Sequence, residues 1–396
     1  NILLELIFVE ELPQVMLNIA AEQLGFYRSP TKRGFLMFKR AIIILTALSI
    51  MGVTTMTSKA RDFRPPATPL VTVDPYYCVW SMTDKLTDEW TKHWTGAAHS
   101  MCGMAYIDGK PYRFMGPQPD EAPIMEQTEL KVYPTRSIYR FEGAGIGLTI
   151  TFMTPLLLDD LDVMSRPASY IEFEVVSTDG KNHDVTLYLD VTGEWVVNTP
   201  DQKVVWGRLQ LGGDKPIDVL RIGSLDQPVL EKAGDNLIID WGYLHLTFPK
   251  TAENSGVITS AEESRSSFVK SGVLPASDDM QMPRAARDEW PVMACTMKLD
   301  KVGTAPTSRL VTLVYDDQFS IEYFYRKLRP YWRRNGMEID DLIRTAFKDY
   351  LELKKRCESF DKELMADALK AGGEDYVDIT AIAYRQAIAA HKLTAD

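Results

Sequence analysis

The sequence predicts a mainly β protein with an α-helical C-terminal part, in which a large antiparallel β-sandwich comes first. From about Leu70 to Tyr315, short apolar runs alternate with polar positions and are separated by Gly, Pro, Asn and Asp. This pattern is typical of half-buried strands joined by turns, and many such strands favour a sandwich. After Asp317 the apolar residues instead recur every three or four positions, as on one face of a helix.

The segment before the sandwich has the composition of an export signal. Lys39 and Arg40 follow Met37 and precede the apolar run 41–53, and Ser58-Lys59-Ala60 is a plausible cleavage site. The run is shorter than the ~20 apolar residues that span a bilayer. We therefore predict a signal peptide at 37–60, a periplasmic or secreted protein, and no stable membrane anchor after cleavage. Residues 1–36 are interpreted as an over-extended start.

Composition limits the class of partner and the chemistry. The net charge is −11, which argues against a nucleic-acid partner, and the 45% hydrophobic content supports a sizeable core. The four cysteines show no C-x-x-C spacing, which excludes the usual zinc and redox patterns. Export permits a disulfide, and Cys78 with Cys102 is the one pair considered. The alternative is that the cysteines are small buried apolar residues.

The β-sandwich region is predicted at 61–315. It opens with a strand at Leu70 to Val73 and an Asp74-Pro75 turn, and Asp108-Gly109 predicts a tight hairpin. Further strands are predicted at 148–152, 170–176, 185–191, 204–211, 237–248 and 310–315.

The helices follow in two parts. A linker helix is predicted within 316–337, with Ile321, Phe324, Tyr325, Leu328 and Tyr331 on one face. Residues 338–396 predict the start of a helical domain. A helix at Asp340 to Lys370 stops at Gly372-Gly373, and a final helix runs from Glu374 to Leu393. That helix carries Tyr376, Ile379, Ala383 and Ala387 on a face without a visible partner, so we interpret the chain as truncated.

Several segments together resemble one family of exported enzymes. They are FRPPATPLVTVDPYYCVWS, GMAYIDGKPYRFMG, FMTPLLLDDLDVMSRPASYIEFEV, DVTLYLDVTGEWVVNTPDQKVVWGR and ELMADALKAGGEDYVDITAIAYRQAIAAHKL. In these segments the chain is similar to the exported glutaminase A family from about Arg61 to its end. The resemblance implies a β-sandwich followed by an (α/α)6 toroid, a six-hairpin fold, of which residues from about 338 are the opening, incomplete part. It also implies hydrolysis of L-glutamine to L-glutamate and ammonia by the full-length protein, with this fragment inactive.

Two groups of residues are candidates for contact with a small-molecule substrate. The first is the polar, aromatic loop with Asp84, His93 and Trp94, which could instead be a packing loop. The second is Tyr384-Arg385-Gln386. On a helix, Gln386 leans toward the expected buried face and Arg385 points elsewhere. Arg385 either forks onto a substrate carboxylate or pairs with a carboxylate between hairpins.

Other motifs give no catalytic assignment. The sequence has no Gly-x-Ser-x-Gly elbow and no His pair at metal-ligand spacing, so the catalytic residues stay unassigned and no cofactor or metal is predicted. The run 158–162 could bind a hard cation or be a solvated turn. Trp195 and Trp206 could stack on a sugar or fill the core. A six-hairpin glycoside-processing enzyme and a non-catalytic β-sandwich module that binds carbohydrate or a partner are the alternative functions.

Overall fold

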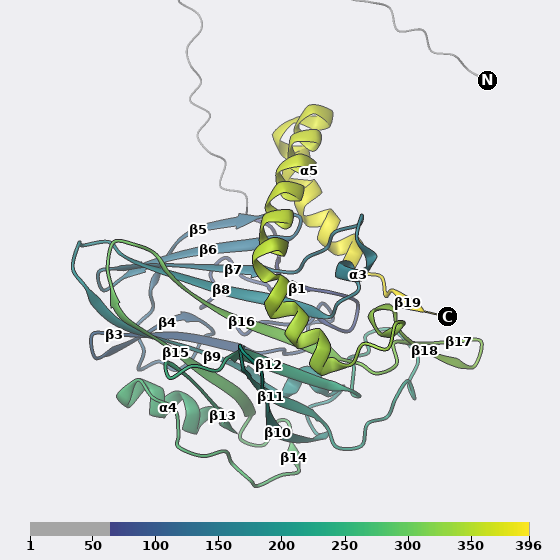
Figure 1. The fold of residues 1–396 in the computed structure, drawn as a ribbon, viewed down its shortest axis with the longest axis horizontal. Helices are drawn as coiled ribbons and strands as arrows, with labels where there is room; N and C mark the ends of the chain where they lie inside the picture. The colour runs from purple at the N-terminus through teal and green to yellow at the C-terminus, as the bar shows by residue number, and fades with distance from the viewer. Residues whose placement is uncertain (1–63, 396) are drawn as a thin grey trace, which may run out of the picture. The chain divides into compact units, whose positions relative to one another are not determined.

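Residues 64–395, the part of the chain that the computed structural model describes, are built around two antiparallel β-sheets (Figure 1). In this part the larger sheet has nine strands, in the order β14 (Arg284–Ala285), β10 (Lys203–Leu211), β11 (Ile217–Ser224), β12 (Tyr243–Pro249), β16 (Thr307–Asp316), β8 (Ala168–Ser177), β7 (Ile146–Met153), β6 (Arg136–Gly143) and β5 (Glu126–Val132). The smaller sheet has five described strands, in the order β13 (Asn254–Ser260), β15 (Pro291–Val302), β9 (His183–Thr192), β3 (Met101–Ile107) and β4 (Lys110–Met115). The expected signal peptide and start, residues 1–60, lie outside the described residues.

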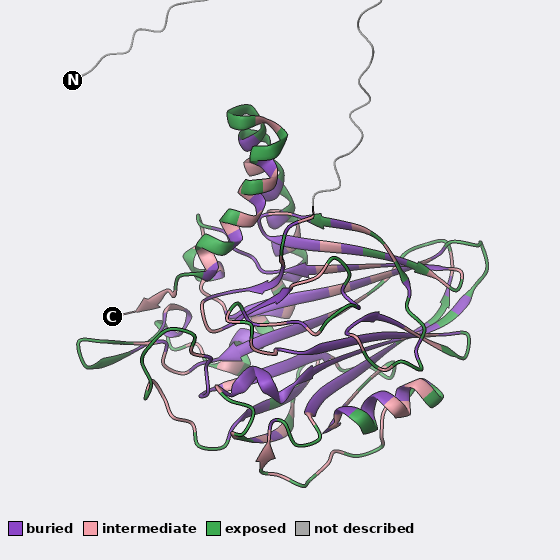
Figure 2. Cartoon of the chain, turned by 180° about the vertical axis from the view of Figure 1, so that it is seen from behind, coloured by how far each residue is buried: buried purple, intermediate pink, exposed green. Residues whose placement is uncertain are grey.

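The two sheets pack face to face through alternating side chains. In β8, Ile171 and Phe173 are fully buried in the core that the sheets share, whereas Tyr170 faces the opposite side. Successive side chains of a strand point to opposite faces, so the larger sheet is buried on both faces at this part of β8. Full burial of one such side chain contributes about 1.5–3 kcal/mol. Figure 2 shows both sheets as mostly buried.

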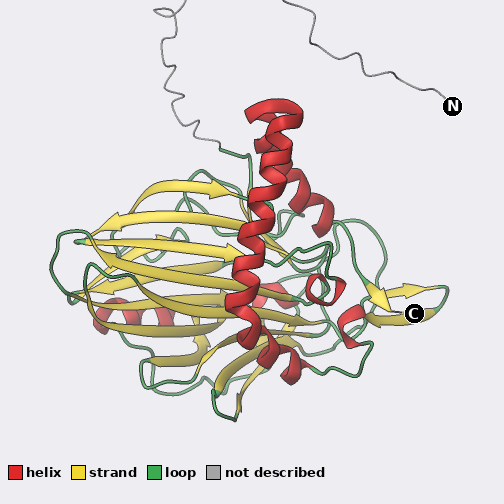
Figure 3. Ribbon diagram, turned by 45° about the horizontal axis from the view of Figure 1, so that its top comes forward, coloured by secondary structure: helices red, strands yellow, loops and turns green. Residues whose placement is uncertain are grey.

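Part of the opposite face of the larger sheet is covered by helix α5 (Ile339–Ala389), which crosses its strands (Figure 3). The helix is broken at Gly373, where φ is 76° and ψ is −169°, so that its second half returns along the first. In the first half Ala346 accepts a hydrogen bond from the Tyr170 hydroxyl at 3.2 Å. The predicted fold class, mainly β with a helical C-terminal part, is confirmed, as is the break at Gly372-Gly373.

A polar junction fixes α5 to the sandwich. Asp361, in the first half of α5, is buried and accepts hydrogen bonds from the Thr135 backbone and hydroxyl, each at 2.9 Å. Its second oxygen accepts from Arg136 Nε at 2.8 Å. Because a buried carboxylate must be fully hydrogen-bonded, this cluster defines where α5 sits on the sheet.

The predicted linker helix is wrong. Residues Ile321–Tyr323 (β17) and Arg326–Pro330 (β18) form a hairpin, and β18 also pairs with β19 (Thr394–Ala395). Phe324 and Tyr325 form its turn with φ of 46° and 64°, and their rings are exposed. The apolar spacing resembled a helix face, but its aromatic residues lie at a turn and have no core to cover.

The structure also contains an unpredicted helix, α4 (Ala261–Ser271), against the outer face of the smaller sheet. Its N-cap, Ser260, accepts a hydrogen bond from the Glu263 backbone at 3.1 Å. The spacing of Ser260 and Glu263 matches a capping-box signature, which was the available sequence signal. The Asp108-Gly109 hairpin joins β3 to β4 as predicted, with φ of 49° and 85° at the two turn residues.

Among the described residues, no helix is both long enough and apolar enough to cross a membrane.

Candidate functional site

The turn between β1 (Thr68–Thr72) and β2 (Cys78–Ser81) organises the first candidate site. The Asp74 carboxylate is buried and accepts from the backbone N–H groups of Tyr76 and Tyr77, both at 2.9 Å. This side chain closes the turn locally, as aspartate commonly does. The turn leaves the Pro75 carbonyl pointing to the aromatic loop that follows β2.

His93 and Trp94 both donate to that carbonyl. The distances to the Pro75 oxygen are 2.8 Å from His93 Nε2 and 2.8 Å from Trp94 Nε1. His93 Nδ1 lies 2.9 Å from the Thr95 hydroxyl and accepts from it, because the proton is on Nε2. His93 is fully buried, whereas Trp94 is 49% exposed. His93 therefore holds the loop in place, and Trp94 presents its ring.

Trp94 and Gln386 line one pocket of about 560 Å³, which we call the Trp94 pocket. Cys78, Trp80 and Met82 contribute further walls from the β2 region, and the end of α5 closes the other side. The lining is mostly apolar, and the Gln386 amide supplies a polar group. Pockets of this size and composition are typical of small-molecule sites. The structure thus brings together two of the six predicted contact residues, although they are almost 300 positions apart.

The other predicted candidates lie elsewhere. Asp84 is exposed outside the pocket, and its backbone carbonyl accepts from Gln127 Nε2 at 2.8 Å. Tyr384 donates to the Leu156 carbonyl, and its ring packs on Phe360. Neither residue lines the Trp94 pocket.

The predicted orientation of Arg385 and Gln386 is reversed. Arg385 is fully buried and donates to the hydroxyls of Thr72, at 3.1 Å, and Ser137, at 3.2 Å. Burial lowers its pKa to about 10. The helix packs through Val377, Ala381, Arg385 and Ala389, so Gln386 is exposed. The prediction assumed that the apolar residues were the buried ones, but the sandwich supplies hydroxyl partners for an arginine.

A buried ion cluster behind the Asp74 turn was not predicted. Lys392 bridges Asp74 and Asp317, with 2.7 Å between its Nζ and the Asp317 carboxylate. Burial acts to lower the pKa of Lys392, but the two carboxylates raise it overall. The cluster ties the end of α5 to the turn that positions Trp94. No local motif reveals it, because Lys392 and Asp74 are 318 positions apart.

The remaining motifs are structural. All four cysteines are free and buried, so the Cys78–Cys102 disulfide is absent, and burial raises the pKa of the Cys78 thiol to about 12. Trp195 and Trp206 are buried, and their indole nitrogens donate to backbone carbonyls. In the run 158–162, Asp160 caps α3 (Leu161–Met164) and bonds to Arg356. Within residues 64–395, no group of three or more His, Cys, Asp or Glu side chains could hold a metal ion.

His93 makes stability sensitive to acid. Burial lowers its pKa to about 4, against an ordinary value near 6.5. The unfolded chain therefore takes up a proton below about pH 6.5, while the folded state stays neutral until about pH 4. The free energy of unfolding should fall across this window, by up to about 3 kcal/mol from this residue.

We expect His93→Gln to reduce the loss of stability between pH 6.5 and pH 4, measured by urea unfolding at each pH. His245, whose pKa burial also lowers to about 4, keeps part of the acid sensitivity in the variant. The control is His391→Gln, because His391 is exposed. An unchanged pH profile in His93→Gln would contradict the prediction.

Family models match two parts of the chain. The family described as "Domain of unknown function (DUF5127)" matches residues 135–367, which is more than half of the chain. A second, "Domain of unknown function (DUF4964)", matches residues 43–124.

Two curated proteins are similar over most of the chain. Glutaminase A from Aspergillus oryzae is 26% identical over 366 residues, covering 88% of this chain and 52% of that protein. A protein named "Probable glutaminase" from Arthroderma benhamiae is 24% identical over 369 residues, covering 84% of this chain and 41% of that protein. The chain spans about half the length of the curated relatives it matches.

Among solved structures, "Putative kojibiose phosphorylase from human microbiome" has a TM-score of 0.42 and 8% identity. The match covers 81% of this chain and 39% of that one. A likeness at this level does not specify the function of this chain.

Proposed function

The chain belongs to the DUF5127 family, and from its similarity to two glutaminases we propose that the complete protein hydrolyses L-glutamine to L-glutamate and ammonia. The observation that carries the proposal is the 26% identity to Glutaminase A over 366 residues. This similarity covers 88% of the chain. We place the activity outside the cytoplasm, following the expected signal at 37–60, and we place α5 at the opening of a six-hairpin domain.

The Trp94 pocket is compatible with glutamine as a ligand. The aliphatic stem of glutamine would pack against the indole rings of Trp80 and Trp94, which line the pocket. Its amide has one acceptor and one donor group, and the Gln386 amide offers the matching pair. The aliphatic stem and the side-chain amide of the ligand therefore each have a partner of suitable chemistry.

The lining residues support binding rather than bond cleavage. Hydrolysis requires a water oxygen to attack the amide carbon while the C–N bond breaks and ammonia leaves with an added proton. Cys78 is the one nucleophile type in the lining, and its raised pKa keeps it as a thiol at neutral pH. Both nitrogens of His93 are engaged, Nε2 by the Pro75 carbonyl of the β1–β2 turn and Nδ1 by the Thr95 hydroxyl. We infer that the groups that activate water lie beyond the described residues, in the additional length of the relatives.

Trp94→Ala tests this placement in the protein produced from the complete gene. Loss of the ring should raise the KM for L-glutamine about tenfold with a smaller change in kcat, because the ring would contact bound substrate before and during the reaction. The readout is ammonia release at varied L-glutamine concentrations. The matched control is Tyr376→Ala, since Tyr376 is 48% exposed and does not line the Trp94 pocket.

The two parts of the proposal fail separately. An unchanged KM in Trp94→Ala, with turnover intact, would contradict the Trp94 pocket as the substrate site. Absence of ammonia release by the folded wild-type protein would contradict glutamine hydrolysis itself. Release of sugar from a glycan by that same protein would favour the glycoside-processing alternative.

A further inference from the structure

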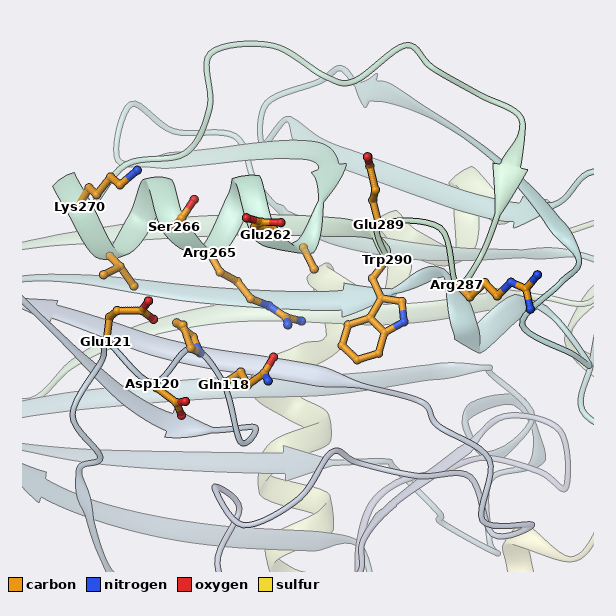
Figure 4. A pocket seen from close by; sticks show the side chains of 13 residues that line it. Gln118, Asp120, Glu121, Glu262, Arg265, Ser266, Lys270, Arg287, Glu289 and Trp290 are labelled. Carbon is orange, nitrogen blue, oxygen red and sulfur yellow. The ribbon is translucent and has the colours of Figure 1, made fainter.

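A second cavity, of about 690 Å³, lies on the smaller sheet beside α4, and we call it the α4 cavity (Figure 4). Its walls are α4, the segment 118–121 that follows β4, and the segment 287–290 that precedes β15. None of its lining residues belongs to the Trp94 pocket or to the predicted contact candidates. It therefore needs an explanation of its own.

Trp290 forms an aromatic wall that is held in an unusual backbone conformation. Glu289 and Trp290 have φ of 56° and 45°, a left-handed conformation that costs about 1–3 kcal/mol for each non-glycine residue. Their carbonyls both accept from the Ala261 N–H, at 3.2 and 2.9 Å, which fixes them to the start of α4. The Trp290 ring meets Trp90 edge to face at 5.7 Å. In Figure 4 the ring points into the space between α4 and segment 118–121.

Arg265 places a rigid donor at the base of the cavity. Its Nε and Nη2 donate to the two oxygens of Asp190, at 2.8 and 2.9 Å, and its guanidinium lies 4.7 Å from the centre of the Trp90 ring. Arg265 is buried, yet it lines the cavity. The ion pair does not use Nη1, so this nitrogen is the one that can donate to a ligand. A preorganised guanidinium loses little entropy on binding.

The rim carries exposed polar side chains from α4 and from segment 118–121. Gln118, Asp120, Glu121 and Glu262 line the cavity and are exposed, and each ends in a planar group with two polar atoms. Such groups can bridge adjacent hydroxyls on a ring. Lys270 and Arg287 are also exposed in the lining, so the rim carries both signs of charge. A ligand that reaches from the base to the rim must accept a hydrogen bond from Arg265 and donate hydrogen bonds to the carboxylates.

These requirements favour one class of ligand. The rim carboxylates stand beside the cations Lys270 and Arg287, and the Arg265 charge at the base is paired with Asp190, so the lining favours neither an anion nor a cation. A hydroxyl group is neutral and both donates and accepts. An indole face provides an apolar surface for the C–H face of a sugar ring. We propose that the α4 cavity binds a neutral oligosaccharide, with one sugar ring stacked on Trp290 and its hydroxyls shared between Arg265 and the rim. This binding is independent of glutamine hydrolysis.

Calorimetric titration of the full chain tests the proposal. The probes are five neutral hexasaccharides: maltohexaose, cellohexaose, xylohexaose, mannohexaose and N-acetylchitohexaose. We expect saturable binding of at least one with a stoichiometry of one. Trp290→Ala should weaken that binding at least about tenfold, and Trp290→Phe, which retains an aromatic face, should weaken it less. The control is Tyr325→Ala, because Tyr325 is 96% exposed and lies in the β17–β18 hairpin.

Thermal unfolding of each variant separates lost binding from lost folding. The proposal is overturned if no hexasaccharide binds the folded protein at concentrations up to about 10 mM, or if a folded Trp290→Ala variant keeps the wild-type affinity. Spermine serves as a cationic probe. Binding of spermine in place of every hexasaccharide would also overturn the proposal, because it would show that the rim charge dominates the site.

Discussion

Replacing Asp190 with alanine should lower the free energy of unfolding by about 3–5 kcal/mol. Asp190 is fully buried on β9, and its carboxylate accepts hydrogen bonds from Nε and Nη2 of Arg265 on α4. Its removal leaves the guanidinium buried without a counter-charge, and Tyr188 loses the acceptor at 2.7 Å for its hydroxyl. The cost of an uncompensated buried charge exceeds that of any exposed ion pair. Denaturant unfolding of the purified variant gives the value.

Asp201→Ala is the matched control. Asp201 pairs with Arg287 at the surface, where both side chains are mostly exposed, and such pairs contribute about 0–1 kcal/mol. A double variant, Asp190→Leu with Arg265→Met, should recover most of the lost stability because it removes both charges together. Equal effects of Asp190→Ala and Asp201→Ala would contradict the role assigned to the buried pair.

Replacing Gly242 with alanine should cost about 3–5 kcal/mol, from steric overlap and backbone strain together. Gly242 has φ of 77°, and a Cβ there would lie 2.2 Å from the Asp316 carbonyl oxygen. The obstruction is backbone at the end of β16, so rotation of a side chain cannot relieve it. The Gly242 N–H and carbonyl also both bond to the Gln227 side chain, at 2.6 and 3.1 Å. A displaced strand end would disturb Asp316 and Asp317, which hold Arg333 and Lys392.

Gly109→Ala separates the two causes. Gly109 has a similar φ of 85°, but a Cβ there meets nothing within 4 Å. Its replacement should cost only the left-handed conformation, about 1–2 kcal/mol. The two variants are compared by denaturant unfolding under the same conditions. The steric explanation fails if Gly242→Ala is no more destabilising than Gly109→Ala.

The elements that could be predicted from the sequence are those whose signal is local. The alternation in 148–152 predicts β7 because its inward residues belong to the sandwich core. The Asp108-Gly109 turn predicts the β3–β4 hairpin through its two residues alone. Gly373 marks the break in α5 because it adopts a conformation that other residues disfavour.

The errors occur where distant parts of the chain decide the outcome. Helix α4 lacks an apolar stripe because its buried face includes Ser264 and Arg265. The carboxylate that pairs with this arginine belongs to Asp190, 75 positions away in the sequence. Arg385 is buried by hydroxyls on β1 and β6, so the apolar residues of its helix could not identify the buried face. For the candidate site, Trp94 stands out in a polar loop. Gln386 lies in the same pocket because α5 turns back at Gly373 and because Lys392, just after α5, pairs with Asp74. The pairing of Lys392 with Asp74 cannot be read from the local sequence.

Ammonia release from L-glutamine by the protein from the complete gene, with residues 61–396 assayed in parallel, tests the central claim most directly. We expect turnover by the complete protein and none by residues 61–396, with circular dichroism showing that both are folded. This result would agree with the proposal that the remaining length of the protein supplies the catalytic groups. No ammonia release by the folded complete protein would contradict the proposed glutamine hydrolysis. Turnover by residues 61–396 alone would contradict the placement of the catalytic groups beyond them.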